Sequence, residues 1–124
     1  MASILVIDDE PLILENLGKF LRFQGHDVIK AHNGQEALIQ IEEHLPDMIF
    51  CDVVMPRMDG LSLLVRLQSN EKTRSIPFVI LSASAEIERL KSALSQGASA
   101  YVVKPFNLAE IGRLLELHLP PNRP

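Results

Sequence analysis

An apolar segment, an acidic cluster and a proline follow one another in Ile4-Leu5-Val6-Ile7-Asp8-Asp9-Glu10-Pro11. The apolar part is continuous rather than alternating, which is typical of a strand that is covered on both faces. Pro11 suits the first turn of a helix, because the N–H that proline lacks would have no partner there. The segment therefore predicts a buried parallel strand that leads through an acidic loop into a helix.

The same pattern recurs along the chain. Further continuous apolar runs occupy residues 48–51, 78–81 and 101–103, and the more polar stretch 27–31 predicts an edge strand. Between and after these strands, apolar residues recur at the spacing of one helix face and predict five helices. They are Ile13, Leu17, Phe20 and Leu21; Ala37, Leu38, Ile41 and Leu45; Leu61, Leu64 and Val65; Ile87, Leu90 and Leu94; and Leu108, Ile111, Leu114 and Leu115. Five alternating strands and helices predict an α/β fold, a doubly wound five-stranded parallel sheet with helices on both faces.

Helix ends carry their own signals. Gly25, Pro46 and Gly97 follow predicted helices and are typical stops, whereas Asp59 and Asn107 precede helices as N-caps. Asn107 is followed three residues later by Glu110, which approximates a capping box.

Length and composition limit the class of protein. The 124 residues fit one domain, which we expect over 1–119, with 120–124 as a Pro-rich tail or the start of a linker. Hydrophobic residues make up 47% and charged residues 23%, which excludes disorder. The net charge of −4 argues against nucleic acid or an anionic membrane as a direct partner.

The compartment is predicted from weaker signals. Cys51 is the single cysteine, which suits a reducing environment. The mean hydropathy of +0.13 is high, yet the apolar runs are too short to span a membrane. The first predicted strand begins at Ser3, which leaves no room for a secretory signal before it. These features favour a cytoplasmic protein.

Polar residues follow the predicted strands at the ends where parallel α/β sheets bind ligands. They are Asp8, Asp9 and Glu10 after the first strand, Asp52 after the third, Ser82 after the fourth and Lys104 after the fifth. Carboxylates gathered at one edge repel each other and favour a bound cation. Oxygen ligands alone indicate a hard ion such as Mg²⁺, and an aspartate beside Mg²⁺ and a lysine is a plausible phosphoryl acceptor.

Plainer interpretations exist for several of these residues and for their neighbours, and Asp52 could be a carboxylate in a loop. Asp8 and Asp9 could cap the helix that begins at Pro11, since acidic residues favour that end. Ser82 could be a turn residue, and Tyr101 could simply pack against its neighbours. Cys51 precedes Asp52 directly, so their side chains point to opposite faces of the strand. This favours a thiol buried in the core over a reactive one. His26, His32, His44 and His118 lack the spacing of metal ligands.

Three sequence blocks carry a resemblance to a known family. They are Val6-Ile7-Asp8-Asp9-Glu10-Pro11, Cys51-Asp52-Val53-Val54-Met55-Pro56-Arg57-Met58-Asp59-Gly60 and Val103-Lys104-Pro105-Phe106. Together they resemble the receiver (phosphoacceptor) domain of bacterial two-component response regulators, from Ile4 to about Leu119. The resemblance implies the flavodoxin-like (βα)5 receiver fold and a role in phosphorelay signalling.

The resemblance also implies a role for each matching position. Asp52 corresponds to the phosphoacceptor, Asp9 to the direct Mg²⁺ ligand and Asp8 to a second acidic residue at the ion. The backbone carbonyl of Val54 corresponds to the remaining protein ligand. Lys104 corresponds to the lysine that pairs with the acceptor carboxylate and later with the phosphoryl oxygens.

Two further positions correspond to the family's switch residues. Ser82 and Tyr101 match the hydroxyl and the aromatic side chain that change position on phosphorylation, with serine in place of the commoner threonine. The Lys104-Pro105 bond resembles one that is cis in the family, and X-Pro is where the cis form costs least. The positions that approach the acyl phosphate match Val54 and Ser84, which are poorly suited to orienting water, so we expect slow hydrolysis.

The implied partner is a histidine kinase or a histidine phosphotransfer protein, and the implied output is a surface made by the fourth helix, fifth strand and fifth helix. That surface would bind an output domain or form a homodimer.

Three rival functions remain. A Mg²⁺-dependent phosphohydrolase would carry Asp-x-Asp on the first strand, and a nucleotide or flavin binder would need a glycine-rich first loop. A receiver-like domain that is never phosphorylated is the third, and intact Asp9, Asp52 and Lys104 count against it.

Overall fold

A computed structural model describes residues 2–53, 55, 58–82 and 87–119, with the side chains of 87–90 excepted. Strands and helices alternate along the chain as β1 (Ser3–Ile7), α1 (Pro11–Phe23), β2 (Asp27–Ala31), α2 (Gly34–Glu43), β3 (Met48–Asp52), α3 (Gly60–Gln68), β4 (Phe78–Ser82), α4 (Ile87–Ser95), β5 (Ala100–Val103) and α5 (Leu108–His118). This order confirms the predicted elements. Within the described ranges, no helix is both long and apolar enough to cross a membrane.

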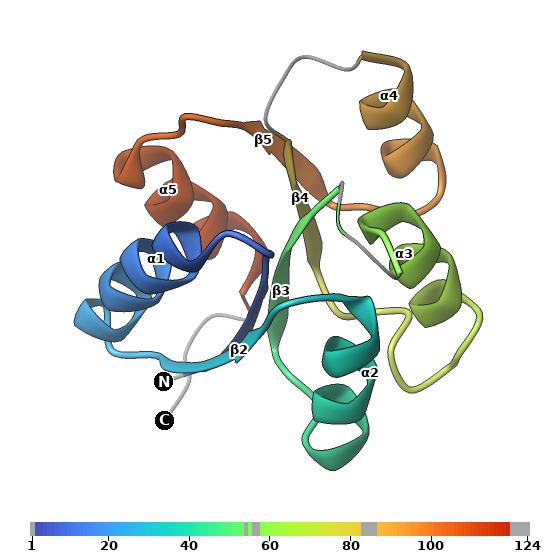
Figure 1. The fold of residues 1–124 in the computed structure, drawn as a ribbon, viewed down its shortest axis with the longest axis horizontal. Coiled ribbons are helices and arrows are strands. Elements are labelled where there is room, and N and C mark those ends of the chain that lie inside the picture. The colour runs from blue at the N-terminus through green and yellow to red at the C-terminus, as the bar shows by residue number, and fades with distance from the viewer. Residues whose placement is uncertain (1, 54, 56–57, 83–86, 120–124) are drawn as a thin grey trace.

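The five strands form one parallel sheet in the order β2-β1-β3-β4-β5 (Figure 1). The register pairs Asp52 with Leu81 and Ser82 with Val103, so the carboxyl ends of β3, β4 and β5 lie level with one another. β1 is the neighbour of β3 on the other side. The topology therefore brings the polar residues at the strand ends to one edge of the sheet.

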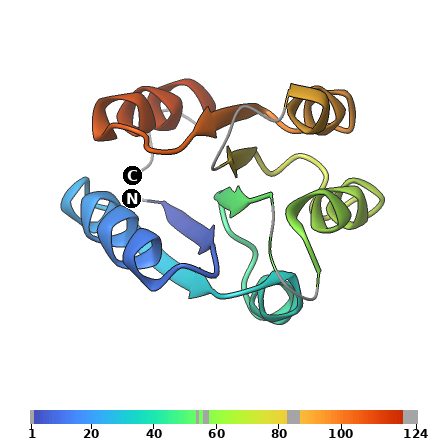
Figure 2. The ribbon, with the colours of Figure 1, turned by 45° about the horizontal axis from the view of Figure 1, so that its top comes forward.

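Helices cover both faces of the sheet, with α1 and α5 on one face and α2, α3 and α4 on the other (Figures 1 and 2). Alternate residues of β3 divide between the two cores. Phe50 packs in the core that contains Leu17 of α1 and Ile111 of α5, whereas Ile49 lies in the core that contains Leu63 of α3. This arrangement confirms the doubly wound α/β fold.

Short polar side chains start three of the helices. Asn33, Asp59 and Asn107 accept hydrogen bonds from the backbone N–H groups three residues later, which satisfies donors that have no partner inside the helix. The caps at Asp59 and Asn107 were predicted. α1 differs, because its N-cap residue is Glu10, whose side chain makes no capping bond.

The side chains of β5 are more exposed to solvent than the sequence predicts. The apolar run 101–103 was expected to be buried on both faces, but Tyr101 is 44% exposed and Val103 is 37% exposed. The prediction was wrong because β5 is the second edge of an open sheet, whereas only β2 was recognised as an edge. Leu45, Val65, Leu94 and Leu108 are also exposed, although their spacing predicts that they lie on the apolar faces of helices.

Candidate functional site

The Lys104 ammonium lies among three carboxylates at the carboxyl edge of the sheet. Its Nζ atom donates hydrogen bonds to Asp8 Oδ2 at 2.8 Å and to Glu10 Oε1 at 2.9 Å. Asp52 Oδ2 lies 3.6 Å from the same nitrogen, close enough for an ion pair but beyond a strong hydrogen bond. Residues that directly follow β1 and β5 thus meet the last residue of β3 around one positive charge.

Most of this cluster is removed from water. The side chains of Asp8, Asp52 and Lys104 are 0%, 8% and 9% exposed, respectively. Burial raises the pKa of Asp8 above its ordinary value, and the bond to Lys104 offsets this only in part. Burial disfavours the charge on Lys104, but the hydrogen bonds to Asp8 and Glu10 outweigh it and raise the lysine pKa to about 12. The ammonium is therefore charged at neutral pH.

Backbone contacts hold the acidic loop after β1. Asp8 N–H donates to the carbonyl of Ala31 at 3.1 Å, which continues the β1–β2 pairing past the end of the strand. Asp8 Oδ1 accepts from the backbone N–H of Glu10 at 2.9 Å. The carbonyl of Glu10 then accepts from Ile13 and Leu14 in the first turn of α1. One short turn therefore fixes both acidic residues relative to the helix.

Asp52 is held by a close approach between β3 and α3. Val53 N–H donates to the Leu81 carbonyl at 2.9 Å, and Gly60 N–H donates to the Val53 carbonyl at 3.0 Å. A Cβ atom on Gly60 would lie 2.5 Å from the backbone oxygen of Asp52. The start of α3 can approach the strand end this closely because residue 60 has no side chain.

Ser82 links the fourth strand to the lysine. Its carbonyl accepts the backbone N–H of Lys104 at 2.6 Å, and the residue is 1% exposed. Tyr101, on β5, presents 44% of its surface to solvent. The Lys104-Pro105 bond is cis, as predicted.

The structure brings Asp8, Asp52 and Lys104 together and aligns Ser82 beside them. Asp9 is exposed and stays a predicted Mg²⁺ ligand, whereas Glu10, which had no predicted role, contributes a carboxylate to the cluster. No sequence signal distinguishes Glu10 from other acidic residues at a helix start, because acidic residues favour that end. Val54 and Ser84, which the family pattern also singles out, lie outside the described residues.

The donor set suits a hard divalent cation. Asp8, Glu10 and Asp52 each offer a carboxylate oxygen, and these atoms lie within 4.8 Å of one another. It is the single group of this kind in the described part of the chain. Oxygen ligands with no sulfur or imidazole favour Mg²⁺ or Ca²⁺ over Zn²⁺.

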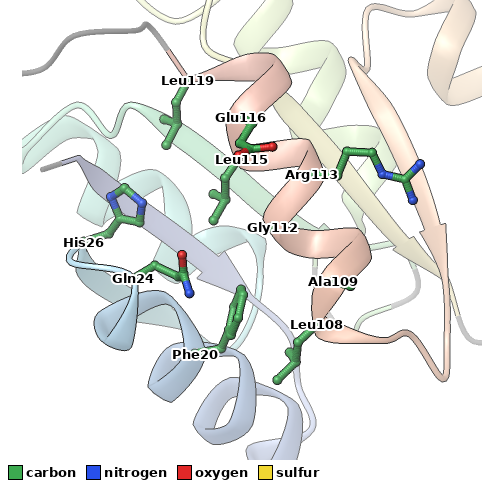
Figure 3. Close-up of a pocket in the computed structure, with 10 residues that line it drawn as sticks. All are labelled: Phe20, Gln24, His26, Leu108, Ala109, Gly112, Arg113, Leu115, Glu116 and Leu119. Carbon is green, nitrogen blue, oxygen red and sulfur yellow. The ribbon is translucent and has the colours of Figure 1, made fainter.

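Other polar and reactive groups lie elsewhere. Cys51 is buried, and burial raises the pKa of its thiol well above the ordinary value, as expected of an inert core cysteine. His32 pairs with Glu36 at 3.0 Å on the surface. A cavity of about 660 Å³ lies between α1 and α5, bordered by Phe20, Leu115 and other residues (Figure 3). None of its lining residues belongs to the acidic cluster, so this cavity is separate from the candidate site.

Comparison with known proteins agrees with this geometry. The family model described as "Response regulator receiver domain" matches residues 4–116. The transcriptional regulatory protein PdtaR of Mycobacterium tuberculosis is 36% identical over 115 residues, which cover 92% of this chain and 55% of PdtaR. The chain thus spans about half the length of that relative.

Solved structures show the same fold at moderate identity. The chemotaxis protein CheY4 of Vibrio cholerae superposes with a TM-score of 0.90 at 28% identity, covering 96% of this chain and 99% of that one. The receiver domain of a Francisella response regulator superposes with a TM-score of 0.86 at 32% identity, covering 94% and 95%. Five parallel strands, the acidic edge with its lysine and the match over 4–116 lead to one conclusion: this chain belongs to the response regulator receiver domain family.

Proposed function

We propose that the chain accepts a phosphoryl group on Asp52, in the presence of Mg²⁺, from a histidine kinase or a histidine phosphotransfer protein. The observation that carries this proposal is the position of Lys104 Nζ, which contacts Asp8, Glu10 and Asp52 at once. A carboxylate next to a fixed ammonium and an oxygen-rich cation site has what phosphoryl transfer requires, namely positioning and charge neutralisation.

In the proposed transfer, an oxygen of Asp52 forms a bond to phosphorus as the bond between phosphorus and the donor's imidazole nitrogen breaks. The electron pair of the broken bond stays on the imidazole. The family pattern assigns Asp8, Asp9, Asp52 and the Val54 carbonyl to Mg²⁺, and the cluster of carboxylate oxygens that contains Asp8 and Asp52 supports this assignment. The ion, when bound, would neutralise the charge of the carboxylates and of the incoming phosphoryl oxygens.

Lys104 supplies the positive charge that recognises the product. Its pKa of about 12 keeps the ammonium protonated throughout the physiological range. After transfer, the ammonium pairs with a phosphoryl oxygen on Asp52, which carries more negative charge than the carboxylate it replaces. The chain is therefore a phosphoacceptor module that assists its own phosphorylation and dephosphorylation, not an enzyme that acts on a separate substrate.

The signal is proposed to pass through Ser82 and Tyr101. The Ser82 hydroxyl moves toward the phosphoryl oxygens, and the Tyr101 ring turns inward, a packing change between two states. Exposed apolar side chains on the α4–β5 side support this output face, since Leu94, Tyr101 and Val103 each expose more than a third of their surface. An output domain or a second copy of the chain would bind the surface formed by α4, β5 and α5.

The proposal also covers the extent of the domain, its location in the cell and the lifetime of its phosphorylated form. Residues 1–119 form the receiver domain, and 120–124, outside the described residues, form a tail or the start of a linker. The domain works in the cytoplasm, without direct contact to nucleic acid or membrane. Hydrolysis of the acyl phosphate is slow, because Val54 has no polar side-chain group and Ser84 is too short to orient water.

Intact-mass spectrometry with a small phosphodonor tests the proposal. With Mg²⁺, the parent protein gains one phosphoryl group, and both Asp52→Asn and added EDTA abolish the gain. Asp9→Ala loses Mg²⁺ affinity and labelling together. Asp27→Asn is a matched control, because Asp27 is an exposed aspartate at the opposite end of the sheet, and it labels like the parent. Labelling of Asp52→Asn at the parent's level contradicts the proposal.

A further inference from the structure

Lys104 is bound more closely to Glu10 than to the residue proposed to be phosphorylated. Its Nζ atom lies 2.9 Å from Glu10 Oε1 but 3.6 Å from Asp52 Oδ2. An ammonium has three donors, and two of them are used in the hydrogen bonds to Asp8 and Glu10. Glu10 therefore competes with Asp52 for the same positive charge.

Of these partners, Glu10 is the one whose carboxylate can separate from the Lys104 ammonium with little loss of free energy. Its side chain is 60% exposed, whereas that of Asp8 is fully buried. The backbone of Glu10 is fixed by its bonds to Asp8 and to the first turn of α1, so only the side chain needs to move. A released Glu10 carboxylate would be hydrated, and exposed ion pairs contribute little to stability.

We propose that Glu10 is a positioning residue that holds Lys104 away from Asp52 until a phosphoryl group arrives. The inference rests on the proposed function of Asp52. When phosphoryl oxygens add negative charge beside Asp52, Lys104 exchanges the Glu10 carboxylate for a phosphoryl oxygen, and Glu10 turns to solvent. Glu10 thus stabilises the unphosphorylated state selectively, and this lowers the affinity of the site for the phosphoryl group.

Beryllofluoride, a non-covalent mimic of the phosphoryl group, measures that affinity directly. Glu10→Gln removes the charge and keeps the size of the side chain. At a Mg²⁺ concentration that saturates each variant, Glu10→Gln is expected to bind beryllofluoride roughly two- to fivefold more tightly than the parent, as fits the loss of one part-exposed ion pair. Glu15→Gln, the same change at an exposed position of α1, is expected to leave the affinity unchanged. Equal or weaker binding by Glu10→Gln overturns the proposal.

Crystal structures of the parent and Glu10→Gln, both without metal, provide a readout that does not depend on phosphorylation. In the variant, Lys104 Nζ is expected to move to about 2.8 Å from Asp52 Oδ2, the length of a charge-assisted hydrogen bond. A distance that stays at the parent's 3.6 Å overturns the positioning role. If the parent itself does not bind beryllofluoride, the proposed function fails, and the two crystal structures still decide whether Glu10 restrains the lysine.

Discussion

The backbone oxygen of Asp52 lies where a side chain on Gly60 would begin: a Cβ atom added to Gly60 would come within 2.5 Å of that oxygen and 3.0 Å of Val53 Cα. Gly60 is also the first residue of α3 and donates its N–H to the Val53 carbonyl. The start of the helix therefore sits directly against the residue proposed to carry the phosphoryl group. Any atom added at position 60 has to displace the backbone of Asp52.

Gly60→Ala is expected to lower the free energy of unfolding by about 1–3 kcal/mol, the usual cost of overpacking a well-packed site. It should also reduce phosphorylation of Asp52, since the obstructed atom belongs to the acceptor's own backbone. Urea denaturation measures the first effect, and the rate of labelling by a small phosphodonor measures the second.

Gly112→Ala is the matched control within α5. An added Cβ there meets only Phe20 Cζ at 3.7 Å, an ordinary contact. Alanine is favoured over glycine inside a helix, so Gly112→Ala is expected to raise the free energy of unfolding by up to about 1 kcal/mol. If both variants change stability in the same direction, the close approach at Gly60 does not control the site.

Tyr101 offers a direct optical report of the switch, because the chain has one tyrosine and no tryptophan. The ring is 44% exposed, and the proposed inward turn shields it from solvent. Beryllofluoride with Mg²⁺ is therefore expected to reduce acrylamide quenching of tyrosine fluorescence in the parent. Ser82→Ala should lose most of that reduction, since it lacks the hydroxyl. Unchanged quenching in the parent after beryllofluoride binds would count against this route.

Lys104→Ala leaves the buried Asp8 and Asp52 without the cation that lies between them. We expect a loss of about 3 kcal/mol in the free energy of unfolding in EDTA, typical of breaking a buried ion pair by removing one partner. Mg²⁺ should restore more stability to this variant than to the parent, because the ion replaces the missing charge. Lys19→Ala, at an exposed position of α1, should show neither effect.

Phosphorylation of Lys104→Ala is expected to proceed slowly and to leave Tyr101 quenching unchanged, since the charge that pairs with the phosphoryl oxygens is gone. A variant that still shields Tyr101 when phosphorylated would show that signalling does not need the lysine.

His26 gives the fold a pH dependence away from the acidic site. Its Nδ1 atom accepts the backbone N–H of Ala2 at 3.2 Å, and burial lowers the pKa of the imidazole below its ordinary value of 6.5. Because the folded state favours the neutral ring, this contribution to stability is complete above pH 6.5 and is lost as the pH falls through the lowered pKa.

His26→Asn keeps an acceptor but cannot take up the proton, so its stability should fall less steeply between neutral and mildly acidic pH. Urea denaturation across that range is the measurement. His44→Asn, at an exposed helix end, should retain the parent's slope. A slope in His26→Asn equal to that of the parent would remove His26 as the cause.

The sequence predicts the site largely through the strands. Asp8, Asp52 and Lys104 each follow a short apolar run, and parallel pairing alone brings such residues to one edge. Ser82 is located by the same reasoning, and its register with Val103 agrees. Cap residues are equally local, because the Asp59 and Asn107 side chains bond to backbone three residues away.

The contact between Glu10 and Lys104 could not be predicted from the pattern. Asp9 and Glu10 both follow β1, and which carboxylate reaches Lys104 depends on the turn in which Asp8 Oδ1 accepts the Glu10 N–H. The exposure of Tyr101 was missed for a related reason. An apolar run is similar in a central strand and an edge strand, and only the strand order β2-β1-β3-β4-β5 shows that β5 has one neighbour.

Chemical mapping of the modified residue decides whether Asp52 is the phosphoacceptor. Borohydride reduces the acyl phosphate of an aspartate to homoserine, so the modified position can be found by sequencing peptides with mass spectrometry. After treatment with a phosphodonor and Mg²⁺, we expect homoserine at position 52 and unmodified aspartate at positions 8 and 9. Homoserine at another position, with Asp52 unchanged, would show that Asp52 is not the phosphoacceptor.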